Sequence, residues 1–162
     1  MADGIYYAGR LREVFLSGTW IANTNYKLAV DGLTWADATR KIGSHNSIAE
    51  LVYHINYYLQ GLIPVLDGGP LEIKDKYSFD LPPIASEEEW QVLNAELLGH
   101  AEKFAGRVER MTAEEMAVSF VKAEYGTYER NIEAVIEHGY YHLGQIVLIR
   151  KLIEEKKKDT DL

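Results

Sequence analysis

Apolar residues recur at helical spacing along most of this chain of 162 residues, and this periodicity restricts its fold more than any other feature. Turn and capping signals divide the periodic sequence into four long segments, at about 5–29, 48–66, 87–111 and 128–155. Capping boxes are predicted at three helix starts, Ser47–Glu50, Ser86–Glu89 and Thr112–Glu115. Short helices are expected near 35–41 and after Thr112, and no strand series is visible. The sequence therefore predicts an all-α fold, a four-helix bundle in one domain over residues 1–162.

Two interruptions of the pattern carry further predictions. Gly18 and the poor helix formers after it predict a bend or a crowded backbone contact in the first long helix. Residues 68–85 contain three prolines and no sustained period. Antiparallel neighbours need only a short loop, so this long connection predicts a crossover between the second and third long helices. Its apolar residues predict that it lies ordered against the bundle.

Composition excludes several classes of function. The chain has no cysteine, which rules out disulfides, thiolate ligands and a cysteine nucleophile, and fits a reducing cytoplasm. A net charge of −8 argues against nucleic acid as a partner. No apolar run approaches the roughly 20 residues of a membrane span, and no signal peptide is visible, so no membrane partner is expected. Phosphate-binding loops, nucleophile elbows, His-Glu-x-x-His and the Glu-x-x-His pairs of di-iron bundles are also absent.

Two histidines, His138 and His142, lie four residues apart in the last predicted helix. Side chains at this spacing share one helix face, with Cβ atoms roughly 5–6 Å apart. Both imidazoles can therefore reach one ion at a Zn–N distance of about 2.0–2.1 Å. Taken alone, the pair could equally be two polar residues at the boundary of a helix face that bind no metal.

A third histidine, His54, borders the apolar stripe of the second long helix, where an ionisable side chain needs a partner. By itself it could be a satisfied histidine at the edge of the core. If the second and last helices are neighbours, however, His54 faces His138 and His142. Three neutral ligands leave a divalent ion with a vacant position, which is typical of catalytic metal sites. We predict one divalent transition-metal ion there, Zn, Ni, Fe or Mn.

Four other side chains are weaker candidates. Gln145, three residues after His142, is predicted to orient a ligand or a bound water, with a helix-boundary hydrogen bond as the alternative. Tyr58, one turn after His54, is predicted to lie beside the ligands. His45, in a loop, is expected to line a pocket mouth, and His100 is expected to face solvent.

Three motifs resemble the DinB-like family. Residues 46–54, Asn-Ser-Ile-Ala-Glu-Leu-Val-Tyr-His, are similar to its second-helix motif. Residues 138–146, His-Gly-Tyr-Tyr-His-Leu-Gly-Gln-Ile, are similar to its last-helix motif. Residues 20–23, Trp-Ile-Ala-Asn, fit a segment of its first helix. The resemblance extends from about Trp20 to Lys151, and the two histidine motifs are its specific part.

The resemblance implies a bundle of up-down-down-up topology with a metal on His54, His138 and His142. It also implies a homodimer and a metal-dependent enzyme that acts on a small-molecule substrate with a low-molecular-weight thiol, as an S-transferase or isomerase. Two alternatives remain open. One is a metal-dependent hydrolase, for which the sequence places no general base beside the ion. The other is a non-catalytic dimeric protein, metal-binding or stress-associated, in which the ion only ties helices together.

Overall fold

The structure is a computed structural model that describes residues 3–160, and within this range it is helical, with no strand. The helices, in chain order, are α1 (Gly4–Arg12), α2 (Tyr26–Val30), α3 (Trp35–Ala38), α4 (Ile48–Leu66), α5 (Glu87–Val108), α6 (Ala113–Ala117) and α7 (Tyr128–Thr160). A π-helical turn η1 (Glu13–Ser17) continues α1, and 3₁₀ turns are η2 (Asp75–Tyr77) and η3 (Ala123–Tyr125). The all-α prediction is confirmed. No described helix combines the length and apolar character needed to cross a membrane.

Local sequence sets the helix starts much as expected. Reciprocal capping boxes are formed by Ser47 with Glu50 at α4, and by Thr112 with Glu115 at α6. The predicted box at α5 is only half formed. Ser86 accepts a hydrogen bond from the Glu89 amide, but the Glu89 carboxylate accepts from the amide of Ala85 instead of that of Ser86.

The first long helix is shorter than predicted. Instead of bending, the helix stops at Gly18, where the backbone becomes extended, and resumes only at α2. The alternative, a crowded backbone contact, is present: a Cβ at Gly18 would lie 2.6 Å from the Cα atom of Glu13. Trp20 and Asn23, expected on the first helix, lie in the intervening loop, and Trp20 is 89% exposed. The weak helix formers that predicted a bend are sufficient to end the helix altogether.

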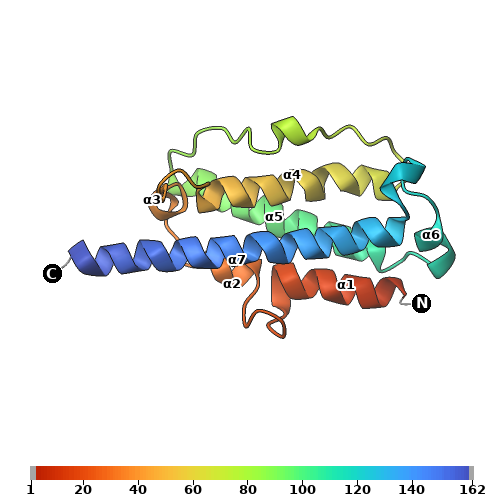
Figure 1. Cartoon of the computed structure of the whole chain (residues 1–162), viewed down its shortest axis with the longest axis horizontal. Helices are drawn as coiled ribbons and strands as arrows, with labels where there is room; N and C mark the ends of the chain where they lie inside the picture. The colour runs from red at the N-terminus through yellow and green to blue at the C-terminus, as the bar shows by residue number, and fades with distance from the viewer. Residues whose placement is uncertain (1–2, 161–162) are drawn as a thin grey trace.

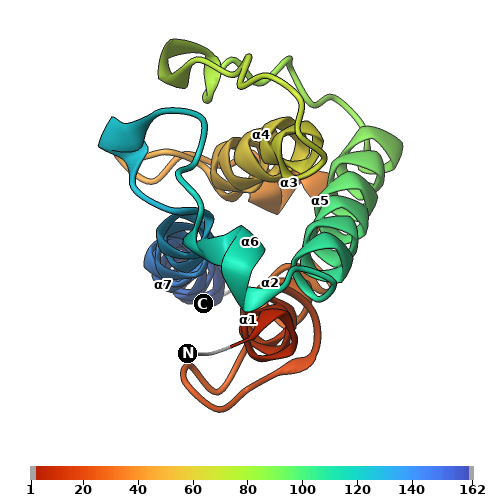
Figure 2. The ribbon, with the colours of Figure 1, turned by 90° about the vertical axis from the view of Figure 1, so that its right-hand side faces the viewer.

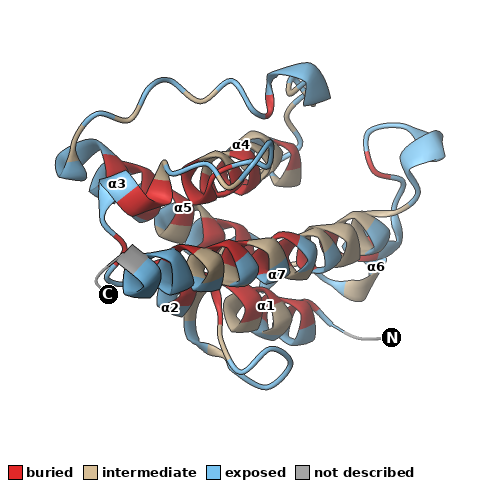
Figure 3. Ribbon diagram, turned by 60° about the vertical axis from the view of Figure 1, so that its left-hand side comes forward, coloured by how far each residue is buried: buried red, intermediate tan, exposed pale blue. Residues whose placement is uncertain are grey.

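Four long elements surround one core. α4 packs against α5 and α7, and α1 packs against the same two helices. Figure 2, which looks along the bundle, shows α1, α4, α5 and α7 around a common centre. In Figure 3 the buried residues face inward on each of these helices. The largest side chains of this core include Trp90, Phe15, Tyr26 and Phe104.

The crossover lies over the outside of α4. In Figure 1 the segment between α4 and α5 returns along the length of α4 before α5 begins. It is ordered against the bundle, as predicted. Ile73 seats so closely on Gly61 of α4 that a Cβ at Gly61 would lie 2.0 Å from the Ile73 Cγ2 atom. Leu81 and Ile84 pack against the core further along. The crossover therefore forms an outer wall over the face of α4 that carries His54.

Gly139, between two of the candidate ligands, lets α7 approach the first helical segment. A Cβ there would lie 3.0 Å from Phe15 and 3.2 Å from Val14. The Tyr26 hydroxyl donates a hydrogen bond of 2.9 Å to the Gly139 carbonyl. The glycine of the last-helix motif thus sets how closely α7 approaches Val14 and Phe15.

Candidate metal centre

Helices α4 and α7 bring His54, His138 and His142 together. The Nε2 atom of His138 lies 3.1 Å from that of His54 and 2.8 Å from that of His142. One ligand atom from each residue can be chosen so that all three lie within 4.8 Å of one another. Among residues 3–160, no other group of three or more histidines and carboxylates is placed to share an ion. The arrangement is the one that the sequence predicted.

The cluster is largely shielded from water. His54 and His142 are 5% and 6% exposed, and His138 is half-buried between them. Phe79, from the crossover, stacks on the His54 ring with a centroid distance of 4.0 Å and an interplanar angle of 13°. This ring therefore covers one face of the His54 imidazole.

Burial makes the three imidazoles neutral ligands. Burial, together with the nearby His142 and His54, lowers the pKa of His138 to about 4. Burial also lowers the pKa of His54 and of His142. A histidine must be neutral to bind a metal ion, so at neutral pH no proton has to be displaced first.

The donor set fits a transition-metal ion. Two nitrogens bound tetrahedrally at about 2.0–2.1 Å from one ion are separated by about 3.3 Å, which is within about 0.5 Å of the Nε2 separations of 3.1 and 2.8 Å in the structure. Three imidazoles suit Zn, Ni or Fe. The His54 Nδ1 atom is buried without a hydrogen bond of standard geometry, although the Ser78 backbone is near enough to raise the His54 pKa slightly. His142 is better supported, as its contact with Gln145 shows.

Gln145 holds His142 in orientation. The Gln145 Oε1 atom lies 2.6 Å from Nδ1 of His142. A carbonyl oxygen only accepts, so Nδ1 carries the proton and donates it to Gln145. The lone pair of His142 Nε2 then points toward the cluster, which is the tautomer that metal binding needs. This is the orienting contact that the sequence suggested for Gln145.

Tyr58 and Asp75 form a polar pair at the edge of the cluster. The Tyr58 ring packs edge-on against His54 and His138, with centroids 5.1 and 5.4 Å away. Its hydroxyl donates a hydrogen bond to the Asp75 carboxylate. Burial and this hydrogen bond raise the pKa of Tyr58 to about 12, so the phenol stays protonated. The negative charge of Asp75 opposes the effect of burial on the pKa values of His54 and His138, which remain lowered.

Sequence reasoning did not identify Asp75 or Phe79. Both belong to the crossover, which has no periodicity, so nothing in the sequence indicates which of its residues face α4. The only available signal was its apolar content, which predicted contact with the bundle but no register.

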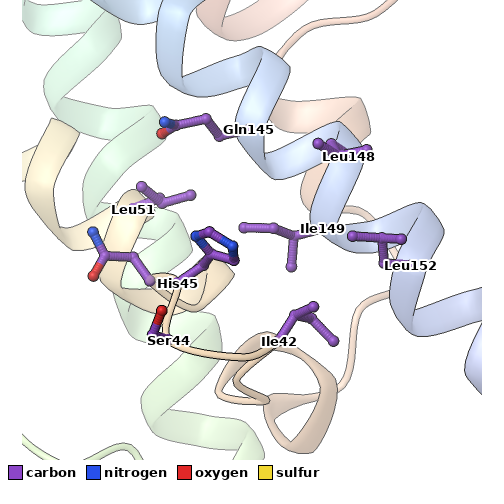
Figure 4. A pocket seen from close by; sticks show the side chains of 9 residues that line it. Ile42, Ser44, His45, Leu51, Gln145, Leu148, Ile149 and Leu152 are labelled. Atoms are coloured by element: carbon purple, nitrogen blue, oxygen red, sulfur yellow. The ribbon is translucent and has the colours of Figure 1, made fainter.

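Two cavities flank the histidines along the groove between α4 and α7. One, of about 420 Å³, lies beyond Gln145 and is bordered by Leu51 and by the loop before α4. Figure 4 shows His45 reaching into it from that loop, opposite Ile149 and Leu152 of α7. The other cavity, of about 430 Å³, lies on the far side of the cluster and is bordered by Tyr58, Asp75 and His138.

The other two histidines do not join the cluster. His45 lines a cavity, as expected, but is not part of the three-histidine group. His100 was expected to face solvent and is instead half-buried on α5, where its Nδ1 atom lies 2.8 Å from Oδ1 of the buried Asn56. This contact gives His100 a structural role between α5 and α4.

Fold and site together define a class: a helical protein with three convergent histidines that can hold a metal ion. The model of the DinB superfamily matches residues 22–146, and the chain therefore belongs to this superfamily. The matched range contains all three histidines, so the resemblance carried by the two histidine motifs is confirmed. No curated protein and no solved structure matches the chain.

Proposed function

We propose that this protein is a metal-dependent transferase that joins a low-molecular-weight thiol to a small electrophile. The observation that carries the proposal is that two cavities lie along α4 and α7 on either side of the three histidines: one is bordered by His138, and the other by Gln145, which contacts His142. Two organic reactants need two binding spaces that meet at the reacting centre. A hydrolase needs only one such space and room for water.

The protein's own residues would prepare the site for this reaction. His54, His138 and His142 would hold the ion, and Gln145 keeps His142 in the binding tautomer. A divalent ion in this site supplies a Lewis acid that makes a thiol or water more acidic. In the transfer, the thiol loses its proton to water and its sulfur bonds to the electrophilic carbon. The leaving group departs with the electron pair of the broken bond.

The experiment compares conjugation rates with and without metal. Full-length protein loaded with Zn, Ni, Fe or Mn is mixed with a panel of thiols and 1-chloro-2,4-dinitrobenzene, and the thioether product is followed by absorbance. We expect product formation that requires metal and is lost in His138→Ala. His100→Ala is the matched control, because His100 lies outside the cluster, and it should retain activity. A rate that is unchanged by chelator would contradict the proposal.

A metal-dependent hydrolase is the second candidate, and Asp75 favours it. The sequence placed no general base near the ion, yet the Asp75 carboxylate lies at the edge of the cluster, hydrogen-bonded to Tyr58. A carboxylate in this position could accept a proton from an attacking water. An ester panel without thiol separates the candidates. If esters are hydrolysed only when both metal and Asp75 are present, and added thiols change nothing, the protein is a hydrolase and not a transferase.

The remaining parts of the proposal rest on family membership and on the arrangement of the helices. We propose that α1, α4, α5 and α7 form the up-down-down-up bundle of the family, which the return of the crossover along α4 supports (Figure 1). A homodimer in the cytoplasm belongs to the same proposal, and sedimentation equilibrium tests the dimer. A non-catalytic metal-binding protein would instead bind the ion, gain thermal stability from it, and turn over neither panel.

A further inference from the structure

The cavity on the Tyr58 side of the histidines has mostly apolar walls. They come from four separate parts of the chain: α4, the crossover, the loop before α7, and α7 itself. The apolar side chains are Leu62, Leu71, Ile73, Phe120, Ala134 and Val135. A volume of about 430 Å³ falls within the range of small-molecule pockets, which are concave, apolar and provided with a few polar groups.

Hydrogen bonds fix the walls before any ligand arrives. The Asn131 side chain of α7 donates bonds of 2.8 Å to the carbonyls of Tyr125 and Thr127, which tie the loop to the helix. Within that loop the Phe120 amide donates to the Gly126 carbonyl at 2.8 Å. The crossover is held by two bonds between the Tyr57 hydroxyl and the Lys74 backbone, of 2.9 and 3.0 Å. A pocket with fixed walls loses little entropy when it binds.

The polar residues that line this cavity are Tyr58, Asp75, Tyr125, Asn131 and His138, and three of them belong to the cluster or border it. These three are the Tyr58 ring and hydroxyl, the Asp75 carboxylate and the His138 ring. The Tyr58 proton is already donated to Asp75. A carboxylate only accepts hydrogen bonds, and the neutral His138 ring keeps one N–H donor, so among these three groups the one that bears a charge is the Asp75 acceptor. Asp75 therefore favours a bound molecule that carries a hydrogen-bond donor beside the cluster, and it repels an anionic one.

We propose that this cavity binds the electrophile, and that the electrophile is an uncharged, largely apolar molecule with a hydrogen-bond donor next to its reacting carbon. Its apolar body lies between Ile73, Phe120 and Val135, and its donor faces Asp75. This substrate class rests on the proposed function, since a thiol transferase needs an electrophile. The thiol would then use the cavity beside His45.

Two probes of almost equal shape test this class, the neutral 2-naphthamide and the anionic 2-naphthoate. Their affinities for the full-length chain are measured by naphthalene fluorescence, in chelator so that no ion can bind the carboxylate. The amide measurement is repeated with zinc. We expect naphthamide to bind more tightly than naphthoate by roughly fivefold, the size of effect an exposed charge such as Asp75 produces. Asp75→Asn should remove this preference and leave the naphthamide affinity similar.

A cavity-filling variant locates the site. Ala134→Phe places a ring in the cavity and should weaken naphthamide binding at least tenfold. Ala95→Phe is the matched control: Ala95 is exposed on α5 and is not part of the lining, so binding should not change. Equal binding by parent and Ala134→Phe, or a preference for naphthoate, would overturn the assignment.

A zinc titration of the same samples separates this inference from the proposed function. If the chain takes up no zinc but binds naphthamide as expected, the transferase fails while the ligand class of the cavity stands. If zinc binds and conjugation proceeds, but Ala134→Phe changes neither naphthamide affinity nor the KM for an apolar electrophile, the cavity assignment fails alone.

Discussion

Helix α4 meets its two main neighbours, α5 and α7, in different ways. Towards α5 the core is closed: Trp90, Leu97 and Phe104 of α5 are each at most 2% exposed. Towards α7 the same helix carries His54, which meets His138 and His142 of α7, and two cavities lie along this side. The two faces of α4 therefore have different roles: the face toward α5 stabilises the fold, and the face toward α7 carries the candidate metal site. Because one face of α4 is anchored by apolar packing, the other can hold polar groups and empty space.

Trp90→Ala should give the largest effect and should act on stability alone. The Trp90 side chain is fully buried, and its indole nitrogen donates a 2.9 Å hydrogen bond to the Leu33 carbonyl. Truncation of a buried tryptophan typically lowers the free energy of unfolding by about 4 kcal/mol. At this chain length the melting temperature should fall by about 10 °C. Urea denaturation and zinc calorimetry are compared at a temperature where both proteins are folded, and an equally large loss of zinc affinity would contradict this division of roles between the two faces.

His142→Ala should give the reverse result. Loss of the hydrogen-bonding partner of a ligand already costs about 10–100-fold in metal affinity, so loss of a ligand should cost at least about 100-fold. The unfolding free energy of the metal-free chain should fall by about 1 kcal/mol, the usual net contribution of a hydrogen bond such as the one between His142 and Gln145. Saturating zinc should raise the melting temperature of the parent but not of the variant. His100→Ala is the control that should retain zinc affinity.

Helical periodicity explains which parts of the fold and of the site could be predicted from the sequence. His138, His142 and Gln145 share one helix face by spacing alone, so their relation is local and predictable. His54 joins them because two amphipathic helices must bury their apolar stripes against each other. Both inferences use helical periodicity, which is also the signal that predicted the all-α fold.

Where periodicity is missing, prediction failed. Asp75 and Phe79 reach the cluster from a crossover whose register is set by a tertiary contact, the seating of Ile73 on Gly61. The loop that carries Trp20 and Asn23 was assigned to a helix, because a weak helix signal does not distinguish a bend from a break.

Acid should lower the unfolding free energy of the metal-free chain through its buried histidines, those of the cluster and His100 on α5, because burial lowers the pKa of each of them. Burial lowers the pKa of His138 from 6.5 to about 4, so between these values the unfolded chain binds a proton that the folded chain does not. The contribution of His138 to stability is therefore complete above about pH 6.5 and is lost as the pH falls toward 4. His54 and His142 act in the same direction.

The measurement is the unfolding free energy of the metal-free chain across this pH range. Carboxylates such as Asp37 and Glu50, whose pKa values are lowered by partners, also contribute at low pH. The difference between the parent and His138→Ala removes their effect. The parent should lose more stability than the variant on acidification, and parallel curves would show that His138 is not neutral in the folded chain.

Substitution of Gln145 should give the smallest effect, because its side chain contacts the predicted ligand His142 without being a ligand itself. Gln145→Ala removes the acceptor for His142 Nδ1–H and should lower zinc affinity by about tenfold, the lower end for such partners. Gln145→Glu keeps an acceptor at this position and should retain the affinity of the parent or exceed it. Without metal, Gln145→Glu should melt like the parent, and Gln145→Ala should lose only the same hydrogen bond, about 1 kcal/mol. If alanine and glutamate weaken binding equally, Gln145 acts through packing, and the orientation of His142 depends on the helix alone.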